Sequence, residues 1–276
     1  MLRRILLASA GAVVLTGAPA AANAEEKRPP PTYQPPPGWT GFYGGMNVGG
    51  AFGSPPVTTQ AINVFTLFPS AVALASAYSQ TGSAPVHTSG VIGGGQIGYN
   101  VQLYNNFVVG IETDISGLGQ RGRGSFANTV STANAVVSSE KAVDWLGTVR
   151  GRVGWLVSPT FLIYGDGGLA YGGVRGSTNV HAFWTPGFNA WTDASGGLST
   201  TRVGWTVGGG AEWMFTPNWS LKIEYLYYDL GDATWANSPN SSFDEFVTVT
   251  NISTSTTRFT GNIIRAGLNY QFNFSR

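Results

Sequence analysis

The amino-acid sequence predicts an all-β fold, namely an eight-stranded antiparallel transmembrane up-and-down β-barrel with short periplasmic turns and four long extracellular loops. Apolar and polar residues alternate with period two in eight segments, as in strands whose two faces meet different environments. Short turns and long polar stretches join these segments alternately. Beyond residue 24, no stretch has the roughly 18 consecutive apolar residues of a transmembrane helix, so a membrane-spanning chain must close into a barrel.

The composition narrows the class of protein further. The chain has 276 residues, of which 39 are glycine and only 11% are charged, which is unusual for a soluble globular protein. It contains no cysteine, so a disulfide framework and thiol chemistry are excluded. The few charges, together with 13% aromatic residues, argue against a nucleic-acid-binding protein and against an acidic disordered chain.

The first 38 residues are expected to lie outside the barrel. Arg3 and Arg4, an apolar stretch and the tripeptide Ala22-Asn23-Ala24 are the three parts of a cleaved secretory signal peptide. The following segment contains "PPPTYQPPPG", which favours an extended proline-rich linker in the periplasm. The predicted boundaries are 1–24 for the signal peptide, 25–38 for the linker and 39–276 for the outer-membrane β-barrel domain of a Gram-negative bacterium.

Each predicted strand has one apolar face and one polar or small face. In the sixth strand, Val203, Trp205 and Val207 alternate with Arg202 and Thr206. A soluble barrel would turn its apolar face inward, whereas a membrane barrel turns that face to lipid. Leu146 and Leu226 are the two apolar exceptions on the inward phase. The eight strands are expected within residues 41–53, 90–101, 106–117, 142–155, 160–173, 202–215, 219–228 and 262–272.

The connections between these segments alternate in length. Short turns are expected at 103–105, 157–159 and 216–218, and the long loops, rich in Ser, Thr, Asn and Gly, at about 54–88, 119–141, 174–201 and 233–257. Outer-membrane barrels sort their connections in this way, with short periplasmic turns and long outer loops. The tract "FPSAVALASAYS" in the first loop could form a short surface helix.

Aromatic residues on the outward phase gather at one end of the predicted strands. Tyrosine and tryptophan favour the membrane interface because their rings are amphipathic, and phenylalanine adds apolar area. A weaker second group can be read in Phe52, Trp145, Tyr171, Trp205 and Tyr227. The predicted periplasmic aromatic girdle comprises Phe42, Tyr99, Phe107, Trp155, Phe161, Phe215, Trp219 and Phe272.

The charged residues on the inward phase predict what fills the lumen. An eight-stranded barrel is just wide enough for side chains to fill it, and buried charges must pair. Because acids and bases are nearly balanced, we expect a self-neutralised network that plugs the lumen, with a narrow ion path as the alternative. The predicted network comprises Glu112, Asp114, Asp144, Arg150, Arg152, Asp166, Arg202, Glu212, Lys222, Glu224 and Arg265.

Catalysis is not expected from this sequence. A hydrolytic site would need a nucleophile or activated water beside a base, and no such constellation can be assembled. His87 and His181 lie in predicted loops without metal-ligand spacing, so we expect neither a metal site nor a bound cofactor. Arg121 and Arg123 are expected to contact lipopolysaccharide phosphate or solvent rather than nucleic acid.

Several blocks of the sequence resemble a known family. "GWTGFYGGMNVGGAFG", "WLGTVRGRVGWLV", "YGDGGLAYGG", "GWTVGGGAEWMFTPNWSLKIEYLYYDLGD" and "NIIRAGLNYQF" are similar to the small outer-membrane β-barrel (porin-family) proteins of alphaproteobacteria, which include RopB-like and major immunoreactive outer-membrane proteins. The resemblance runs from about Trp39 to Phe274. It implies a barrel inserted by the barrel-assembly machinery into a membrane of lipid and lipopolysaccharide. The implied roles are envelope integrity, surface antigenicity and sometimes haemin binding, and no site residue is implied.

The functional hypothesis from the sequence is a non-enzymatic integral outer-membrane barrel that contributes to envelope integrity and surface display. A narrow porin-like channel for small solutes or ions is one alternative. The other is a surface binding module for haemin or for a host or environmental partner. That module would need a pocket among the loops around His87, His181 and Trp184. The sequence gives no indication of oligomeric state.

Overall fold

The computed structural model describes residues 38–66, 70–103, 106–184, 191–244 and 247–272. The expected signal peptide and all but the last residue of the expected linker lie outside these residues. Within the described part of the chain, no helix is long and apolar enough to cross a membrane.

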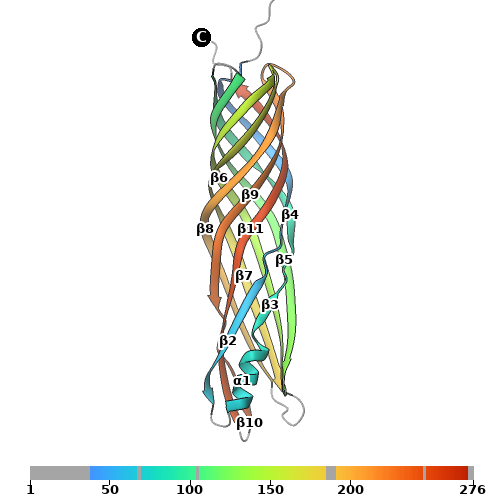
Figure 1. Cartoon of the computed structure of the whole chain (residues 1–276), viewed down its shortest axis with the longest axis vertical. Helices are drawn as coiled ribbons and strands as arrows, with labels where there is room; N and C mark the ends of the chain where they lie inside the picture. The colour runs from blue at the N-terminus through green and yellow to red at the C-terminus, as the bar shows by residue number, and fades with distance from the viewer. Residues whose placement is uncertain (1–37, 67–69, 104–105, 185–190, 245–246, 273–276) are drawn as a thin grey trace, which may run out of the picture. The chain divides into compact units, whose positions relative to one another are not determined.

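All strands belong to one antiparallel sheet, and one short helix accompanies them (Figure 1). The elements in chain order are β1 (Gly41–Gly53), β2 (Val57–Thr66), α1 (Ser70–Ser79), β3 (Gly82–Ala84), β4 (Thr88–Gln102), β5 (Phe107–Val130), β6 (Ala133–Ser158), β7 (Phe161–Trp184), β8 (Trp191–Met214), β9 (Trp219–Ala236), β10 (Asn240–Asp244) and β11 (Val247–Phe272).

The sheet closes on itself through its first and last strands. β1 pairs with β4 on one side and with β11 on the other, and the ring runs β1-β4-β5-β6-β7-β8-β9-β11. The predicted number of eight strands is too low, because the described residues contain eleven. The three strands outside the ring are β2, β3 and β10. β2 pairs with the first half of β11, β3 pairs with β2, and β10 pairs with β11.

The prediction of four long loops is wrong, because most of these residues form strands or a helix. Much of 119–141, 174–201 and 233–257 continues the flanking strands, and 54–88 contains β2, α1 and β3. The Ser, Thr and Asn content suggested loops, yet these residues keep period two. In β11, Asn251, Ser253 and Ser255 are buried and the residues between them are not. Threonine and valine fit a half-buried pleated surface, and small polar residues can point inward where they find hydrogen-bond partners.

The two ends of the barrel therefore differ. The turn end carries the short connections β4–β5, β6–β7 and β8–β9. The hairpin end carries the β5–β6 turn, α1, β2, β3 and β10, at the bottom of Figure 1. The β5–β6 hairpin turns at Ser131, whose φ of 55° lies in the left-handed region that a tight turn uses.

The outer wall is apolar, as lipid requires. Met46, Val91 and Ile115 are more than half exposed, while the residues beside them in sequence point inward or are glycine. Aromatic rings on this wall meet near the turn end, where Phe42 lies 4.6 Å from Tyr99 between ring centroids. All eight residues of the predicted girdle are exposed or partly exposed and lie near that end: Phe42, Tyr99, Phe107, Trp155, Phe161, Phe215, Trp219 and Phe272.

The interior is layered along the barrel axis, as the order of residues on β5 shows. Val108 belongs to an apolar cluster at the turn end, Glu112 and Asp114 to a charged layer, and Leu118 to a second apolar cluster. β7 passes through the same layers from Leu162 onward and ends in a further cluster at the hairpin end. Inward side chains thus fill the ring at successive levels.

Candidate functional site

The charged layer inside the barrel is the most distinctive site in the structure. Nine of the eleven predicted lumen charges are buried there and joined by ion pairs. They come from β5, β6, β7, β8, β9 and β11, while β1 and β4 contribute neutral groups, among them Tyr43 and Gln96. The nine are Glu112, Asp114, Arg150, Arg152, Asp166, Glu212, Lys222, Glu224 and Arg265.

Arg150 lies at the centre of this network. One guanidinium nitrogen, Nη2, donates to Glu112 Oε1 at 2.5 Å and to Asp114 Oδ2 at 2.9 Å. The other, Nη1, donates to Glu224 Oε1 at 3.1 Å and also to Asp166. The planar guanidinium suits this role because its donors diverge toward several carboxylates at once.

Two further cations complete the contacts of the same acids. Lys222 Nζ donates to both carboxylate oxygens of Glu112, at 2.8 and 2.9 Å. Arg265 donates from Nε to Glu224 Oε2 at 2.6 Å and from Nη2 to Asp114 Oδ2 at 3.0 Å. Because every acid here meets a cation, the layer avoids the several-kcal/mol penalty of an isolated buried charge.

Neutral side chains satisfy the remaining acceptors. Tyr43 donates its hydroxyl to Glu112 Oε2 at 2.7 Å, and Tyr164 donates to Glu224 Oε1 at 2.9 Å. Arg152 donates to Glu212 Oε2 at 2.8 Å and lies over the Tyr164 ring, with its guanidinium carbon 3.9 Å from the centroid. The two tyrosines were missing from the predicted network, although their inward phase in the sequence was a usable signal.

Asp144 and Arg202 do not join the network. The β6–β7 register shifts between Val143 and Trp145, and this bulge turns Asp144 outward, where it pairs with Arg175 and lies 3.9 Å from Arg121. A bulge adds one residue to one strand, so a strict period-two count fails across it. Arg202 lies three residues before Trp205, where the main β8–β9 ladder begins, and donates to the backbone carbonyl of Asp232.

An apolar layer closes the network on the turn-end side. Trp39 is almost completely buried and packs with Val108, Leu156, Leu162, Tyr164 and Met214. Its indole nitrogen donates to the carbonyl of Pro159 at 3.0 Å, which fixes the ring across the mouth. The sequence marked Trp39 only as the start of the barrel domain, because its inward position depends on how the chain enters the first strand.

A second apolar layer closes the network on the other side. Leu146 and Leu226, the two exceptions of the inward phase, are members of this cluster. The one polar side-chain group among its members, the Tyr228 hydroxyl, donates to Gln120 Oε1 at 2.5 Å, so it is not free to bind a hydrated ion. The cluster comprises Ala51, Ile92, Leu118, Val143, Leu146, Ala170, Val174, Leu226, Tyr228, Leu230, Ala233, Phe259 and Ile263.

Lys141 lies beyond this layer, toward the hairpin end. Its Nζ donates to the carbonyls of Pro55 at 3.0 Å and Arg258 at 3.1 Å, and lies 5.5 Å from the centroid of the Phe259 ring. Burial lowers the pKa of Lys141 from its ordinary 10.5 to about 8. This side chain ties β6 to β11 and to the β1–β2 connection across the interior.

Helix α1 lies at the hairpin end with Leu74 and Tyr78 exposed and its other face buried, so the expected surface helix is half-buried. Ser76 and Gln80 are completely buried. Asn251 on β11 donates to Ser76 Oγ at 2.7 Å, and Asn240 on β10 donates to Gln80 Oε1 at 3.1 Å. On another side of the helix, Ala75 packs in a cluster with Ala133, Ala135, Ala182 and Trp184. The helix therefore fills the mouth formed by the extended strands.

The two histidines are exposed but do not share a pocket with Trp184. His87 Nδ1 lies 3.2 Å from Ser54 Oγ, whereas His181 Nδ1 lies 2.7 Å from Asp193 Oδ1. His181 points outward from β7, and Trp184, three residues on, points inward and is buried. Within the ranges that the structure describes, no three His, Cys, Asp or Glu residues are grouped so as to hold a metal ion.

Comparisons with known proteins bear on the family and the location. The family model described as the outer membrane protein beta-barrel domain matches residues 8–272. The 31 kDa outer-membrane immunogenic protein of Brucella melitensis is 34% identical over 234 residues, covering 85% of this chain and 84% of that protein. The 22 kDa outer membrane protein of Rhizobium leguminosarum bv. viciae is 36% identical over 145 residues, covering 52% of this chain and 54% of that protein.

A solved structure with similarity is that of the outer membrane protein OprG from Pseudomonas aeruginosa. It is 10% identical, covers 84% of this chain and 96% of its own, and has a TM-score of 0.38. The family match spans nearly the whole chain, and the Brucella protein is similar over most of its own length. This chain is an outer-membrane protein, and it belongs to the outer membrane protein β-barrel family.

Proposed function

We propose that this protein is a non-enzymatic structural barrel of the outer membrane, whose filled lumen does not conduct and whose hairpin end is displayed at the cell surface. The observation that carries the proposal is the order of the layers of side chains inside the ring. Trp39, the ion-pair network, the second apolar cluster and α1 follow one another along the axis.

The chemistry of each layer argues against a narrow porin-like channel. A conducting pore needs a continuous water path with binding sites weak enough for an ion to leave. Here the charges bind each other, and the cluster around Leu146 and Leu226 is apolar except for the Tyr228 hydroxyl, which is already bonded to Gln120. Opening a path would require breaking buried ion pairs and displacing apolar side chains at two separate levels, which costs several kcal/mol at each.

The proposed orientation places the turn end in the periplasm and the hairpin end outside. Short periplasmic turns and long outer extensions are the common arrangement in outer-membrane barrels. In this orientation the strand extensions and α1 form the surface that antibodies and other cells meet. The contribution to the envelope is a rigid, closed wall stabilised from inside by its own ion pairs.

The test is single-channel conductance of the purified, refolded protein in planar bilayers, together with Glu212→Ala and Arg150→Ala. We expect no stable conductance from any folded sample, because the apolar layers remain in both variants. Discrete openings in the unmodified protein that change with either substitution would favour the channel and contradict the filled-lumen proposal.

A surface binding role has one specific observation in its favour. On the outside of the β7–β8 hairpin, the His181 ring lies 5.7 Å from Phe183 and 6.4 Å from Trp191 between centroids. With its Nδ1 proton donated to Asp193, the imidazole presents Nε2 for a ligand. A single histidine beside the exposed ring of Trp191 and the partly exposed ring of Phe183 suits a planar iron porphyrin such as haemin.

This second candidate is tested by haemin titration of the folded protein, followed by absorbance of the porphyrin. If the site binds haemin, His181→Ala should weaken binding about tenfold or more, because an axial ligand is lost. His87→Ala is the matched control, since that histidine is also exposed and its ring contacts Ser54 rather than a carboxylate. Equal losses in both variants, or no binding at all, would remove this candidate.

A further inference from the structure

Three arginines form a patch on the outer wall, which we call the arginine patch: Arg121 and Arg123 on β5 and Arg175 on β7. Arg121 and Arg175 both lie opposite Ala142, so the two guanidinium groups flank one position on β6. Their side chains are 63%, 81% and 50% exposed, respectively. The patch therefore presents its charges outside the barrel, separate from the lumen network.

The patch lies just beyond the aromatic residues of the outer wall on the hairpin side. On β6, Ala142 is three residues past Trp145, and on β7, Arg175 is four residues past Tyr171, whose ring lies 5.9 Å from Trp145. At about 3.3 Å per residue, this is roughly 10–13 Å along the strand. Strand tilts near 35–45° reduce it to roughly 7–10 Å along the membrane normal.

That height is the level of the lipid headgroups. If Trp145 and Tyr171 mark the edge of the hydrocarbon, the headgroup layer extends roughly 5–8 Å further. Arginine side chains are long and flexible enough to reach back into this layer. A soluble polyanion could reach the same groups, but the headgroups are already beside them at high local concentration.

The charges in the patch are not balanced. Arg123 Nε donates to Glu140 Oε2 at 2.9 Å, while Asp144 serves both Arg121 and Arg175. Three guanidinium groups thus share two carboxylates. Because each guanidinium carries five N–H donors, the patch has both an excess positive charge and spare donors for an anion.

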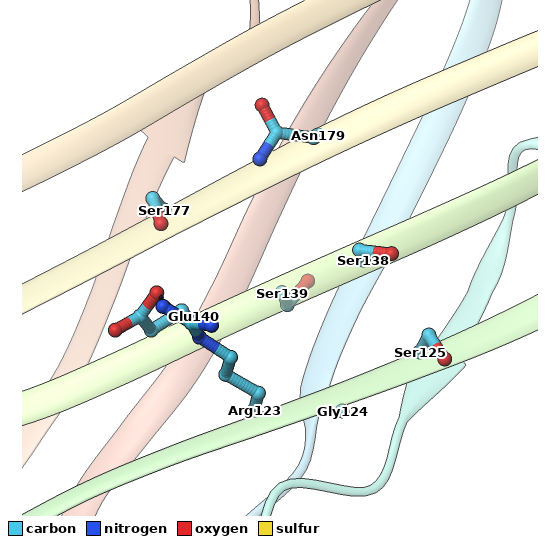
Figure 2. Close-up of a pocket in the computed structure, with 8 residues that line it drawn as sticks. All are labelled: Arg123, Gly124, Ser125, Ser138, Ser139, Glu140, Ser177 and Asn179. Atoms are coloured by element: carbon cyan, nitrogen blue, oxygen red, sulfur yellow. Dashed lines mark hydrogen bonds and ion pairs between the residues drawn. The ribbon is translucent and has the colours of Figure 1, made fainter.

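Polar side chains without charge surround this excess. Figure 2 shows Arg123 beside Glu140, with short polar side chains on the neighbouring strands and the same stretch of wall. The concavity there has a volume of about 460 Å³. Besides Arg123 and Glu140, it is lined by Gly124, Ser125, Ser138, Ser139, Ser177 and Asn179. Hydroxyl and amide donors next to arginines are the groups that bind a phosphate and the sugar that carries it.

We propose that the arginine patch binds the phosphate group of an anionic glycolipid of the outer leaflet, as lipid A presents it. The guanidinium forks donate to the phosphate oxygens, and the serine-lined concavity accommodates the sugar. The geometry and charge belong to the described residues, while the location in the outer leaflet rests on the proposed orientation. The inference extends the structural role, since a bound glycolipid would anchor the barrel in its own leaflet.

The test measures binding of lipid A to the purified protein in detergent micelles by native mass spectrometry. We expect lipid A with both phosphates to bind at least about tenfold more tightly than lipid A from which the phosphates have been removed. The triple variant Arg121→Gln, Arg123→Gln and Arg175→Gln should lose this preference. Arg258→Gln is the matched control, because Arg258 is also exposed and paired with an acid, at 2.6 Å from Asp229.

Two results of this lipid A experiment would overturn the proposal. One is equal binding of the two lipid A forms to the unmodified protein, and the other is an unchanged preference in the triple variant. The variants are compared only after their guanidinium unfolding midpoints match, which we expect because exposed ion pairs contribute little to stability. Stronger competition by a soluble sulfated polysaccharide than by lipid A would assign the patch to a different partner.

Orientation is tested separately, so that the two proposals can fail independently. The chain has no cysteine, and Ser125→Cys introduces a single thiol on the exposed rim of the patch. A membrane-impermeant maleimide should label this variant in intact cells. Absence of labelling in intact cells, with labelling after lysis, would contradict the proposed orientation while the affinities measured in micelles stand on their own.

Discussion

At the scale of single residues, the lumen network distinguishes acids by how many cations they contact. Glu112 meets Arg150 and Lys222 within 2.9 Å and also accepts from Tyr43, whereas Arg150 is the one cation among the described residues that Asp166 meets. Asp166 Oδ1 has no hydrogen-bond partner among the described residues. Five acids share four bases in the layer, so the removal of one acid brings the formal charges into balance.

This asymmetry gives a matched pair of substitutions. Asp166→Asn should change the free energy of unfolding by less than about 1 kcal/mol, because it removes the least-partnered of the five acids. Glu112→Gln should cost about 3–5 kcal/mol, because it leaves buried cations without their partner. Denaturant unfolding of the protein in lipid vesicles measures both. Equal losses would show that contact number does not rank these acids.

Lys141 should make the free energy of unfolding depend on pH in the alkaline range. Its pKa of about 8 in the folded protein lies below the ordinary 10.5, so the unfolded chain binds more protons between these values. Stability should therefore rise as the pH increases from 8 toward 10.5, by up to about 3 kcal/mol. The measurement is the unfolding free energy across this range, minus that of Lys141→Met. A difference that stays flat or falls would contradict the assignment.

At the scale of elements, the eight membrane segments could be predicted because lipid and lumen impose opposite preferences on alternate residues. The extensions toward the hairpin end could not be predicted in the same way. There both faces of β5 and β11 are rich in small polar residues, and the contrast between faces that marks a strand is weak. The bulge at Asp144 also escaped prediction, because a local register shift has no signature in the period-two pattern.

Helix α1 was predicted as a surface helix, but the burial of one of its faces was not predicted. Its residues are small and of mixed polarity, and only the Asn251 and Asn240 contacts show that Ser76 and Gln80 face the interior. Burial of hydroxyl and amide groups is acceptable here because each has a partner. A sequence pattern records the polarity of these residues, but not the partners that other strands bring to them.

The contribution of one hydrogen bond to the docking of α1 can be tested by substitution. Ser76→Ala leaves the Nδ2 group of Asn251 without this acceptor and should weaken the docking of the helix by about 1–3 kcal/mol. Amide hydrogen exchange should become faster at residues 74–80 and stay unchanged in β6 and β7. Tyr78→Ala is the control, since its side chain is exposed. Faster exchange throughout the barrel would show a global rather than a local effect.

At the scale of the whole molecule, the layers explain why the charged residues alone were an incomplete guide to the lumen. The inward charges predicted a plug, and nine of them meet in one layer. The apolar clusters above and below depend on residues from strands far apart in sequence, such as Trp39 with Met214 and Ala51 with Val174. Only the closed ring brings the residues of these clusters together, so no local sequence pattern predicts the clusters.

Closure of the ring also constrains the order in which the protein can form. β11 pairs with β1 and β9 and carries Arg265, which neutralises Asp114 and Glu224. Until this last strand arrives, an inserted intermediate would expose two unpaired edges to hydrocarbon and leave acids in the interior uncompensated. The paired residues of β1 and β11 are more than 200 positions apart in the chain, which makes folding slow and cooperative. A partly synthesised chain therefore has no stable place in the membrane, and insertion follows only after synthesis of β11.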